Sequence, residues 1–155
     1  MDETQERILR IYCDTSVFGG CFDEEFREAS TALLRLFREK EFILVYSDAT
    51  LAELRNAPER VRDILIEMPE GFSEYVEPHP VIDQLREAYL KEGILGPSSA
   101  VDAWHIASAT VGGADMIVSW NFKHIVHYEK IQGFHGVNVL HGFPAIPIYS
   151  PLEVI

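Results

Sequence analysis

Residues 8–17 read ILRIYCDTSV, and they combine a short apolar run with the polar turn that follows it. The run 8–13 is typical of a buried strand, and it ends abruptly at Asp14. Two further apolar runs of this kind occupy residues 42–46 (FILVY) and 114–119 (ADMIVS). The sequence therefore predicts three buried strands that end beside polar residues.

Apolar residues at helical spacing fill the segments between these strands. Asp23 is placed to cap the first helix, Ser47 or Asp48 is placed to cap the second, and Pro58 stops the second. The predicted helices cover residues 23–40, a segment from Ser47 or Asp48 to Ala57, 59–68, 81–92, and a segment from Ser98 or Ser99 to Val111. Further short strands are predicted at 75–79, 137–140 and 146–149.

Strands that alternate with helices predict an α/β fold, here a three-layer α/β/α sandwich with a mainly parallel central sheet. The chain has 155 residues and shows no repeat, low-complexity tract or linker. We therefore expect a single domain over residues 1–155, which at this length buries roughly two-thirds of the surface of the unfolded chain.

The chain is acidic, with 25 Asp and Glu against 13 Lys and Arg and a formal net charge of −12. This charge argues against non-specific binding to nucleic acid, which depends on Lys and Arg. The first ten residues are polar and no apolar run approaches the length of a membrane span, so we expect a cytoplasmic protein without a membrane anchor. Two cysteines make no disulfide framework, and Cys13 is expected to be a buried thiol.

Functional groups of parallel sheets gather beyond the carboxyl ends of the strands, where the sequence places Asp14, Asp48 and Asn121. Asp14 is followed by the hydroxyl residues Thr15 and Ser16. The alternative for Asp14 is that its side chain simply caps a turn or a helix.

Two further acidic residues lie on predicted helices. Glu53 shares a helix face with Asn56, although an exposed surface glutamate is the plain alternative. Asp102 shares a face with His105 in a segment otherwise free of charge, where an acid in the first turn also favours the helix dipole. We expect His105 to be a packed, hydrogen-bonded histidine rather than a ligand.

A polar segment also follows the third strand, where Ser119, Asn121 and His124 are placed to face a site. Several carboxylates at one sheet edge repel each other and need a cation. Asp and Glu oxygens without cysteine suit Mg²⁺ or Mn²⁺, and such an ion activates water for phosphodiester hydrolysis.

The order of these segments resembles the PIN-domain family, the metal-dependent ribonuclease fold of VapC-like toxins in toxin–antitoxin pairs. The similar segments are YCDTSV, SDATLAEL, DAWHIASAT, ADMIVSWNFKHI and the tail IPIYSPLEVI. The resemblance implies that Asp14, Glu53 and Asp102 hold a Mg²⁺ or Mn²⁺ ion, and that Thr15 or Ser16 supports the first aspartate. It also implies an RNA substrate, a homodimer and, for a toxin, a small antitoxin partner.

The chain departs from the family pattern at one position, where His124 stands in place of a fourth aspartate. Asn121 keeps the asparagine of that motif, and Ser119 precedes it. One negative charge fewer favours a one-ion mechanism with Asn121 and His124 orienting water, metal or phosphate. The same change is compatible with a degenerate module that binds RNA or a protein without cleaving.

Other classes of function fit the sequence less well. A phosphoryl-transfer role for Asp14 as nucleophile would call for a DxD pattern, but the second position is Ser16. Dinucleotide binding lacks the GxGxxG pattern. The pair His124 and His127 is the only zinc-like spacing, and no third ligand accompanies it.

Overall fold

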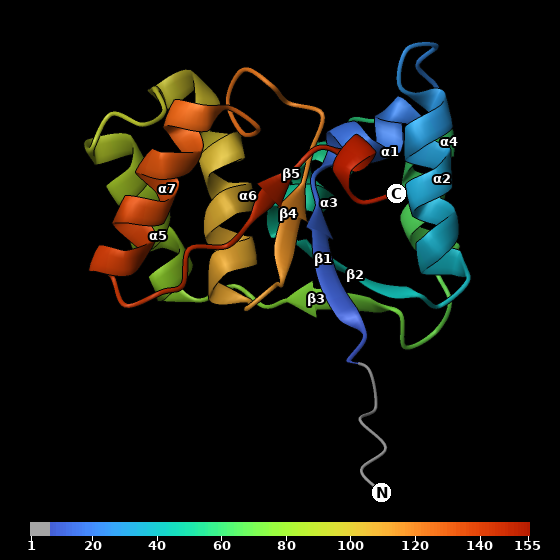
Figure 1. Ribbon diagram of the computed structural model, residues 1–155, viewed down its shortest axis with the longest axis horizontal. Coiled ribbons are helices and arrows are strands. Elements are labelled where there is room, and N and C mark those ends of the chain that lie inside the picture. The colour runs from blue at the N-terminus through green and yellow to red at the C-terminus, as the bar shows by residue number, and fades with distance from the viewer. Residues whose placement is uncertain (1–6) are drawn as a thin grey trace, which may run out of the picture.

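The computed structural model describes residues 7–155, and its elements surround one parallel sheet (Figure 1). The strands are β1 (Leu9–Cys13), β2 (Phe42–Ser47), β3 (Ser73–Val76), β4 (Met116–Val118) and β5 (Ile148–Tyr149). The helices are α1 (Thr15–Gly20), α2 (Arg27–Arg38), α3 (Asp48–Leu54), α4 (Glu59–Ile66), α5 (Pro80–Lys91), α6 (Ala100–Val111) and α7 (Tyr128–Leu140). Two short 3-10 turns are η1 (Pro97–Ser99) and η2 (Pro151–Glu153).

The sheet has the strand order β3-β2-β1-β4-β5, and all four pairings are parallel. The chain leaves β1 toward β2 and β3, then crosses back to place β4 on the other side of β1. This reversal lies between β1 and β4, and ligands of such sheets bind in the crevice beyond the strand ends at that point. The strand order therefore predicts a site at Asp14 and the segment after β4.

Helices cover both faces of the sheet, as the alternation of buried residues requires. Tyr12 packs with helices α5, α6 and α7 on one face, whereas Ile11 and Cys13 pack with α1, α2 and α4 on the other. Figure 1 shows these two helix groups on opposite sides of the strands. The predicted three-layer α/β/α sandwich is confirmed.

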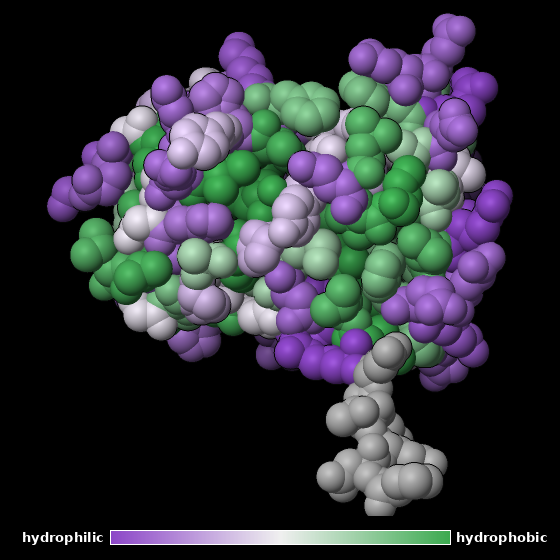
Figure 2. Space-filling model, viewed as in Figure 1, coloured by the Kyte–Doolittle hydropathy of each residue, from purple (hydrophilic) through white to green (hydrophobic). Residues whose placement is uncertain are grey.

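The outer surface agrees with the acidic composition. Hydrophilic side chains lie around much of the rim in Figure 2, while apolar ones gather right of centre near η2 and also on the side of α6 and α7. Exposed acids occur on several helices, among them Glu28, Glu59 and Glu87. Much of the negative charge therefore lies on solvated helix faces.

Several boundaries differ from the prediction. Residues 137–140 form the last turn of α7 and not a strand, because Phe134, Val137 and Asn138 make a helical contact face that the apolar run VNVL concealed. Asp23 does not cap α2; its carboxylate accepts a hydrogen bond from the Glu25 backbone in the turn before the helix. The strand predicted at 75–79 lies at Ser73–Val76, and α1 was not predicted.

Other predictions are confirmed. Ser47 is the N-cap of α3 and accepts a hydrogen bond from the Ala49 backbone. Cys13 is buried, and both cysteines are free thiols. Over residues 7–155, no helix has the combination of length and apolar composition that crossing a membrane requires.

Candidate active site

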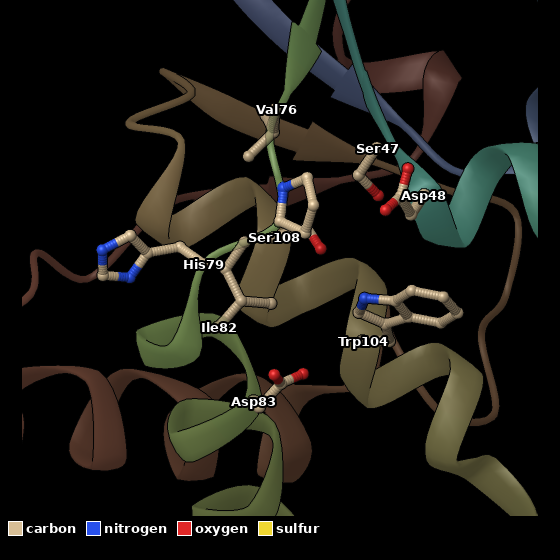
Figure 3. Close-up of a pocket in the computed structure, with 9 residues that line it drawn as sticks. Ser47, Asp48, Val76, His79, Ile82, Asp83, Trp104 and Ser108 are labelled. Atoms are coloured by element: carbon tan, nitrogen blue, oxygen red, sulfur yellow. The ribbon is translucent and has the colours of Figure 1, made fainter.

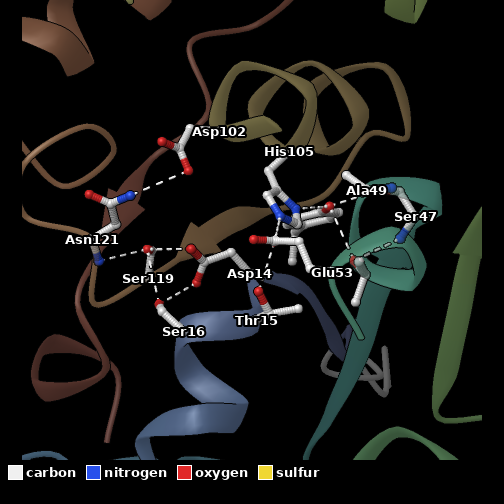
Figure 4. A network of polar contacts seen from close by, with 12 residues as sticks. Asp14, Thr15, Ser16, Ser47, Ala49, Glu53, Asp102, His105, Ser119 and Asn121 are labelled. Atoms are coloured by element: carbon white, nitrogen blue, oxygen red, sulfur yellow. Dashed lines mark hydrogen bonds and ion pairs between the residues drawn. The ribbon is translucent and has the colours of Figure 1, made fainter. Parts of the chain in front are cut away.

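Asp14 lies at the carboxyl end of the central strand β1, directly before α1. Only 4% of Asp14 is exposed, and its side chain caps no helix N–H. One carboxylate oxygen accepts a hydrogen bond from Ser16 Oγ at 2.6 Å, and the other accepts one from Ser119 Oγ at 2.9 Å (Figure 4). Asp14 is the N-cap residue of α1 by position, but its side chain makes no capping hydrogen bond, so capping does not account for this carboxylate.

The Asp14 carboxylate is costly to bury, because it lacks a strong cationic partner. Burial raises the pKa of Asp14 above its ordinary value, although His105 and the hydroxyls of Ser16 and Ser119 act in the opposite direction. Within residues 7–155, neither Asp14 nor Asp102 forms an ion pair. Buried carboxylates of this kind are usually paired or coordinate a metal.

The segment after β4 connects Asp14 to Asp102. Ser119 Oγ, which donates to Asp14, accepts the Asn121 backbone N–H at 2.9 Å. The Asn121 side chain donates to Asp102 Oδ1 at 3.3 Å, and its own oxygen accepts the His124 backbone N–H at 2.9 Å. Asn121 therefore both shapes the turn after β4 and contacts the aspartate of α6.

Asp102 lies in the first turn of α6 and is partly buried. Burial raises its pKa; His105, His124 and the Asn121 hydrogen bond lower it, whereas the charge of Glu53 raises it further. His124 Nδ1 is buried and has no hydrogen-bond partner among the described residues. The histidine at the fourth acidic position thus brings a nitrogen near Asp102 in place of a carboxylate.

Glu53 on α3 has two hydrogen-bond donors on one oxygen. Thr15 Oγ1 donates to Glu53 Oε1 at 2.7 Å, and His105 Nε2 contacts the same oxygen. Burial opposes ionisation of Glu53, but the hydrogen bond and charge of His105 and the hydroxyl of Thr15 lower its pKa on balance. Ser16 is the hydroxyl that supports Asp14, and Thr15 supports Glu53 instead.

His105 is 1% exposed and hydrogen-bonded on both ring nitrogens, as expected for a packed histidine. Its Nδ1 lies 2.6 Å from the hydroxyl of Tyr12. The sequence reasoning missed Tyr12, whose position inside an apolar strand gave no sign that its hydroxyl belongs to the site. Burial raises the pKa of this phenol, so it remains protonated.

Asp48, which also follows a strand, lies apart from this network. It accepts a hydrogen bond from the Tyr75 hydroxyl and lines a separate small cavity between β2, β3, α5 and α6 (Figure 3). That cavity has about 50 Å³ of space for water-sized molecules, and Trp104 and Ser108 also line it. Asp48 therefore does not join the predicted site residues.

The remaining predicted residues gather at one edge of the sheet, with Asp14, Glu53 and Asp102 projecting from three different elements (Figure 4). Over residues 7–155, however, no three His, Cys, Asp or Glu side chains are grouped closely enough to hold an ion together. The donor chemistry still fits a hard cation, since Asp14 and Asp102 offer carboxylate oxygens without ion-pair partners. These residues therefore fit Mg²⁺ or Mn²⁺ by type of ligand.

A sequence model of the PIN domain matches residues 11–124, which is most of the chain and includes every residue of this site. The chain belongs to the PIN-domain family. PIN domains are generally nucleases. No curated protein matches the chain significantly.

Solved structures share the fold at low sequence identity. A chain in the structure of VapBC2 from Rickettsia felis bound to a DNA fragment from their promoter is 15% identical, with a TM-score of 0.55, covering 92% of this chain and 98% of that one. A chain of FitAcB from Neisseria gonorrhoeae is 18% identical, with a TM-score of 0.54 and coverage of 92% and 99%. A chain of FitAB bound to the IR36 DNA fragment is 16% identical, with a TM-score of 0.54 and coverage of 91% and 94%.

Proposed function

We propose that this PIN domain is an endoribonuclease that hydrolyses RNA phosphodiester bonds with the help of Mg²⁺ or Mn²⁺. The observation that carries the proposal is the buried Asp14 carboxylate at the carboxyl edge of the sheet, whose hydrogen-bond partners within residues 7–155 are the hydroxyls of Ser16 and Ser119. The family match over residues 11–124 includes it. A divalent cation supplies the positive charge that such a carboxylate otherwise lacks.

In this proposal Asp14, Glu53 and Asp102 hold the ion. When bound, the ion lowers the pKa of water and stabilises negative charge on a phosphoryl oxygen. Asp14 and Asp102 have raised pKa values, so they bind the ion more weakly as the pH falls toward those values.

The other predicted site residues position groups of the site and do not hold the ion. Ser16 and Ser119 fix both oxygens of Asp14, so that the carboxylate keeps one orientation. Asn121 contacts Asp102 in the same manner from the turn after β4. His124 is partly exposed, and its place in this proposal is to contact phosphate or a water molecule; its Nδ1 itself is buried and has no hydrogen-bond partner within the described residues.

A second function keeps the fold without catalysis. His124 in place of a fourth acid, together with the absence of a preassembled three-ligand group over residues 7–155, favours a degenerate module that binds RNA or a protein. Binding of RNA without cleavage at any Mg²⁺ or Mn²⁺ concentration would support this second function.

We infer further that the protein acts in the cytoplasm as the toxin of a type II toxin–antitoxin pair. Similar chains occur in complexes named VapBC2, FitAcB and FitAB, and a net charge of −12 suits a basic antitoxin. By resemblance to the family, we also propose a homodimer, which sedimentation of the purified chain tests directly.

The test is cleavage of labelled single-stranded RNA with Mg²⁺ or Mn²⁺, with and without EDTA. We expect EDTA to abolish cleavage, and we expect Asp14→Asn and Asp102→Asn to slow it by at least about 100-fold, the loss of a few kcal/mol of transition-state stabilisation. Arg38→Met is the matched control, because Arg38 lies on α2 and forms only a surface pair with Glu67 at 4.0 Å. Cleavage that survives EDTA and both aspartate substitutions contradicts the proposal.

A further inference from the structure

A series of buried, hydrogen-bonded polar side chains leads to Glu53. The Tyr12 hydroxyl is 2.6 Å from His105 Nδ1 and 2.8 Å from Ser47 Oγ, and His105 Nε2 contacts Glu53 Oε1. Tyr12 and His105 are almost fully buried. These hydrogen-bonded side chains join β1, β2, α3 and α6. Both ends of the series lie at α3, because Ser47 caps the helix that carries Glu53.

At Glu53 it is clear which group of this series donates the hydrogen bond and which accepts it. A glutamate of ordinary acidity is ionised at neutral pH, and an ionised carboxylate can only accept hydrogen bonds. His105 Nε2 must therefore carry a proton and donate it to Oε1, whatever group occupies Nδ1. The tautomer of the imidazole is fixed by its partner, as for histidines held beside metal sites.

The hydrogen bonds of Tyr12 fit the same order of donors and acceptors. Ser47 Oγ already accepts the Ala49 backbone N–H at 3.2 Å, so its own proton is free to point toward Tyr12. Tyr12 can then donate to His105 Nδ1, and each buried polar group both donates and accepts.

The consequence for Glu53 is that its two oxygens are unequal. Oε1 accepts two hydrogen bonds, from His105 on α6 and from Thr15 on α1, and these donors fix the plane of the carboxylate. Oε2 accepts no hydrogen bond from the residues described by the structure. The Glu53 side chain is also 38% exposed, so it is not sealed from solvent.

We propose that His105 is a positioning residue, which with Thr15 occupies Glu53 Oε1 and leaves Oε2 as the single oxygen that Glu53 offers to a divalent cation. Tyr12 holds the imidazole in the orientation that this requires. The proposal rests on the proposed function, since it takes Glu53 as a ligand of the ion. Outer partners of metal ligands typically change metal affinity by about 10- to 100-fold when they are removed.

The experiment measures Mn²⁺ affinity directly, by the electron paramagnetic resonance signal of free Mn²⁺, without RNA. His105→Leu removes the donor at similar volume, and His105→Gln retains an N–H that can reach Glu53. We expect His105→Leu to weaken Mn²⁺ binding by about 10- to 100-fold and His105→Gln to restore most of the affinity. Thr15→Val and Tyr12→Phe remove one hydroxyl each at nearly constant shape, and smaller losses of affinity are expected.

Two outcomes overturn the proposal. The first is that the folded His105→Leu and His105→Gln variants bind Mn²⁺ as tightly as the wild type, even if their melting temperatures fall. The second is that the wild type binds no Mn²⁺. For a His105 variant that does not fold, Thr15→Val and Tyr12→Phe decide the question, and unchanged affinity in both overturns the proposal.

A spectroscopic measurement on the metal-free protein is independent of the ion. Long-range ¹H–¹⁵N correlation spectra should show a proton on Nε2 of His105, and a proton on Nδ1 alone would overturn the proposal. The proposed ribonuclease function fails separately: wild-type protein that binds Mn²⁺ with the expected variant pattern but never cleaves RNA contradicts the nuclease and supports the positioning role.

Discussion

The two ends of the parallel sheet differ in how their charged side chains are paired. At the amino ends of the strands, Arg10 pairs with Glu74 through two nitrogens and also donates to the backbone carbonyls of Gly112 and Gly113 at 2.9 and 2.7 Å. Asp115 there accepts the Arg10 backbone N–H and contacts Arg7. This end ties β1, β3 and the turn before β4 together with balanced charge.

At the carboxyl ends, within the described residues, the buried Asp14 carboxylate accepts hydrogen bonds from two hydroxyls and the Asp102 carboxylate accepts one from an amide. Charge imbalance there has no structural benefit, because burial raises the pKa of both carboxyls. We propose that one end of the sheet is arranged for stability and the other for a cationic ligand. Natural sites of function commonly reduce stability in this way.

The largest effect is expected at Asp14, where a role in stability and a role in cation binding predict different results. Asp14→Asn keeps the shape of the side chain and removes its buried charge, so we expect RNA cleavage to fall by at least about 100-fold. The melting temperature of the metal-free variant should not fall and is expected to rise. Thermal denaturation in EDTA, monitored by circular dichroism, checks this; a clear fall would show that Asp14 serves stability.

The opposite pattern is expected at the amino end. Arg10→Met removes the pair with Glu74 and two bonds to carbonyl groups, and we expect the free energy of unfolding to fall by about 1–2 kcal/mol. Urea denaturation measures this loss, with the surface variant Arg38→Met as a control expected to change it by less than about 0.5 kcal/mol. Folded Arg10→Met protein should cleave RNA at the wild-type rate, and a large loss of activity would break the comparison.

The smallest expected effect is a difference in pH dependence between two carboxylates of the site. Because the folded pKa of Asp14 is raised, its contribution to stability is complete below the ordinary aspartate pKa of 3.8 and is lost as the pH rises through the folded value. The folded pKa of Glu53 is lowered below 4.5, so its contribution is present above 4.5 and is lost as the pH falls.

Denaturation of the metal-free protein between pH 3 and 7 tests these signs. The stability of Asp14→Asn relative to the wild type should increase with pH, whereas that of Glu53→Gln should decrease. The same slope for both variants would contradict the assigned environments of the two carboxylates.

Much of this architecture could be predicted from the sequence, because short apolar runs and helical spacing report burial directly. The run 8–13, the cap at Ser47 and the placement of Asp14 at a strand end are local features, and the structure confirms them. The strand predicted at 137–140 was wrong because a short apolar run does not distinguish a strand from the end of a buried helix.

The contacts of the site were less predictable, since they depend on pairs of residues far apart in the chain. The spacing of Asp102 and His105 indicated a shared helix face, but not that His105 would contact Glu53 on another helix. Nor could the sequence distinguish the supporting roles of Ser16 and Thr15, which point to different carboxylates.

We propose that the carboxyl edge of the sheet binds a divalent cation through Asp14 and Asp102. A crystal of the protein grown with Mn²⁺ and measured at a wavelength where manganese scatters anomalously tests this most directly. We expect one anomalous peak within coordination distance of carboxylate oxygens of both Asp14 and Asp102, and no such peak in Asp14→Asn crystals. Saturating Mn²⁺ with no peak at these carboxylates, or a peak elsewhere only, would contradict it.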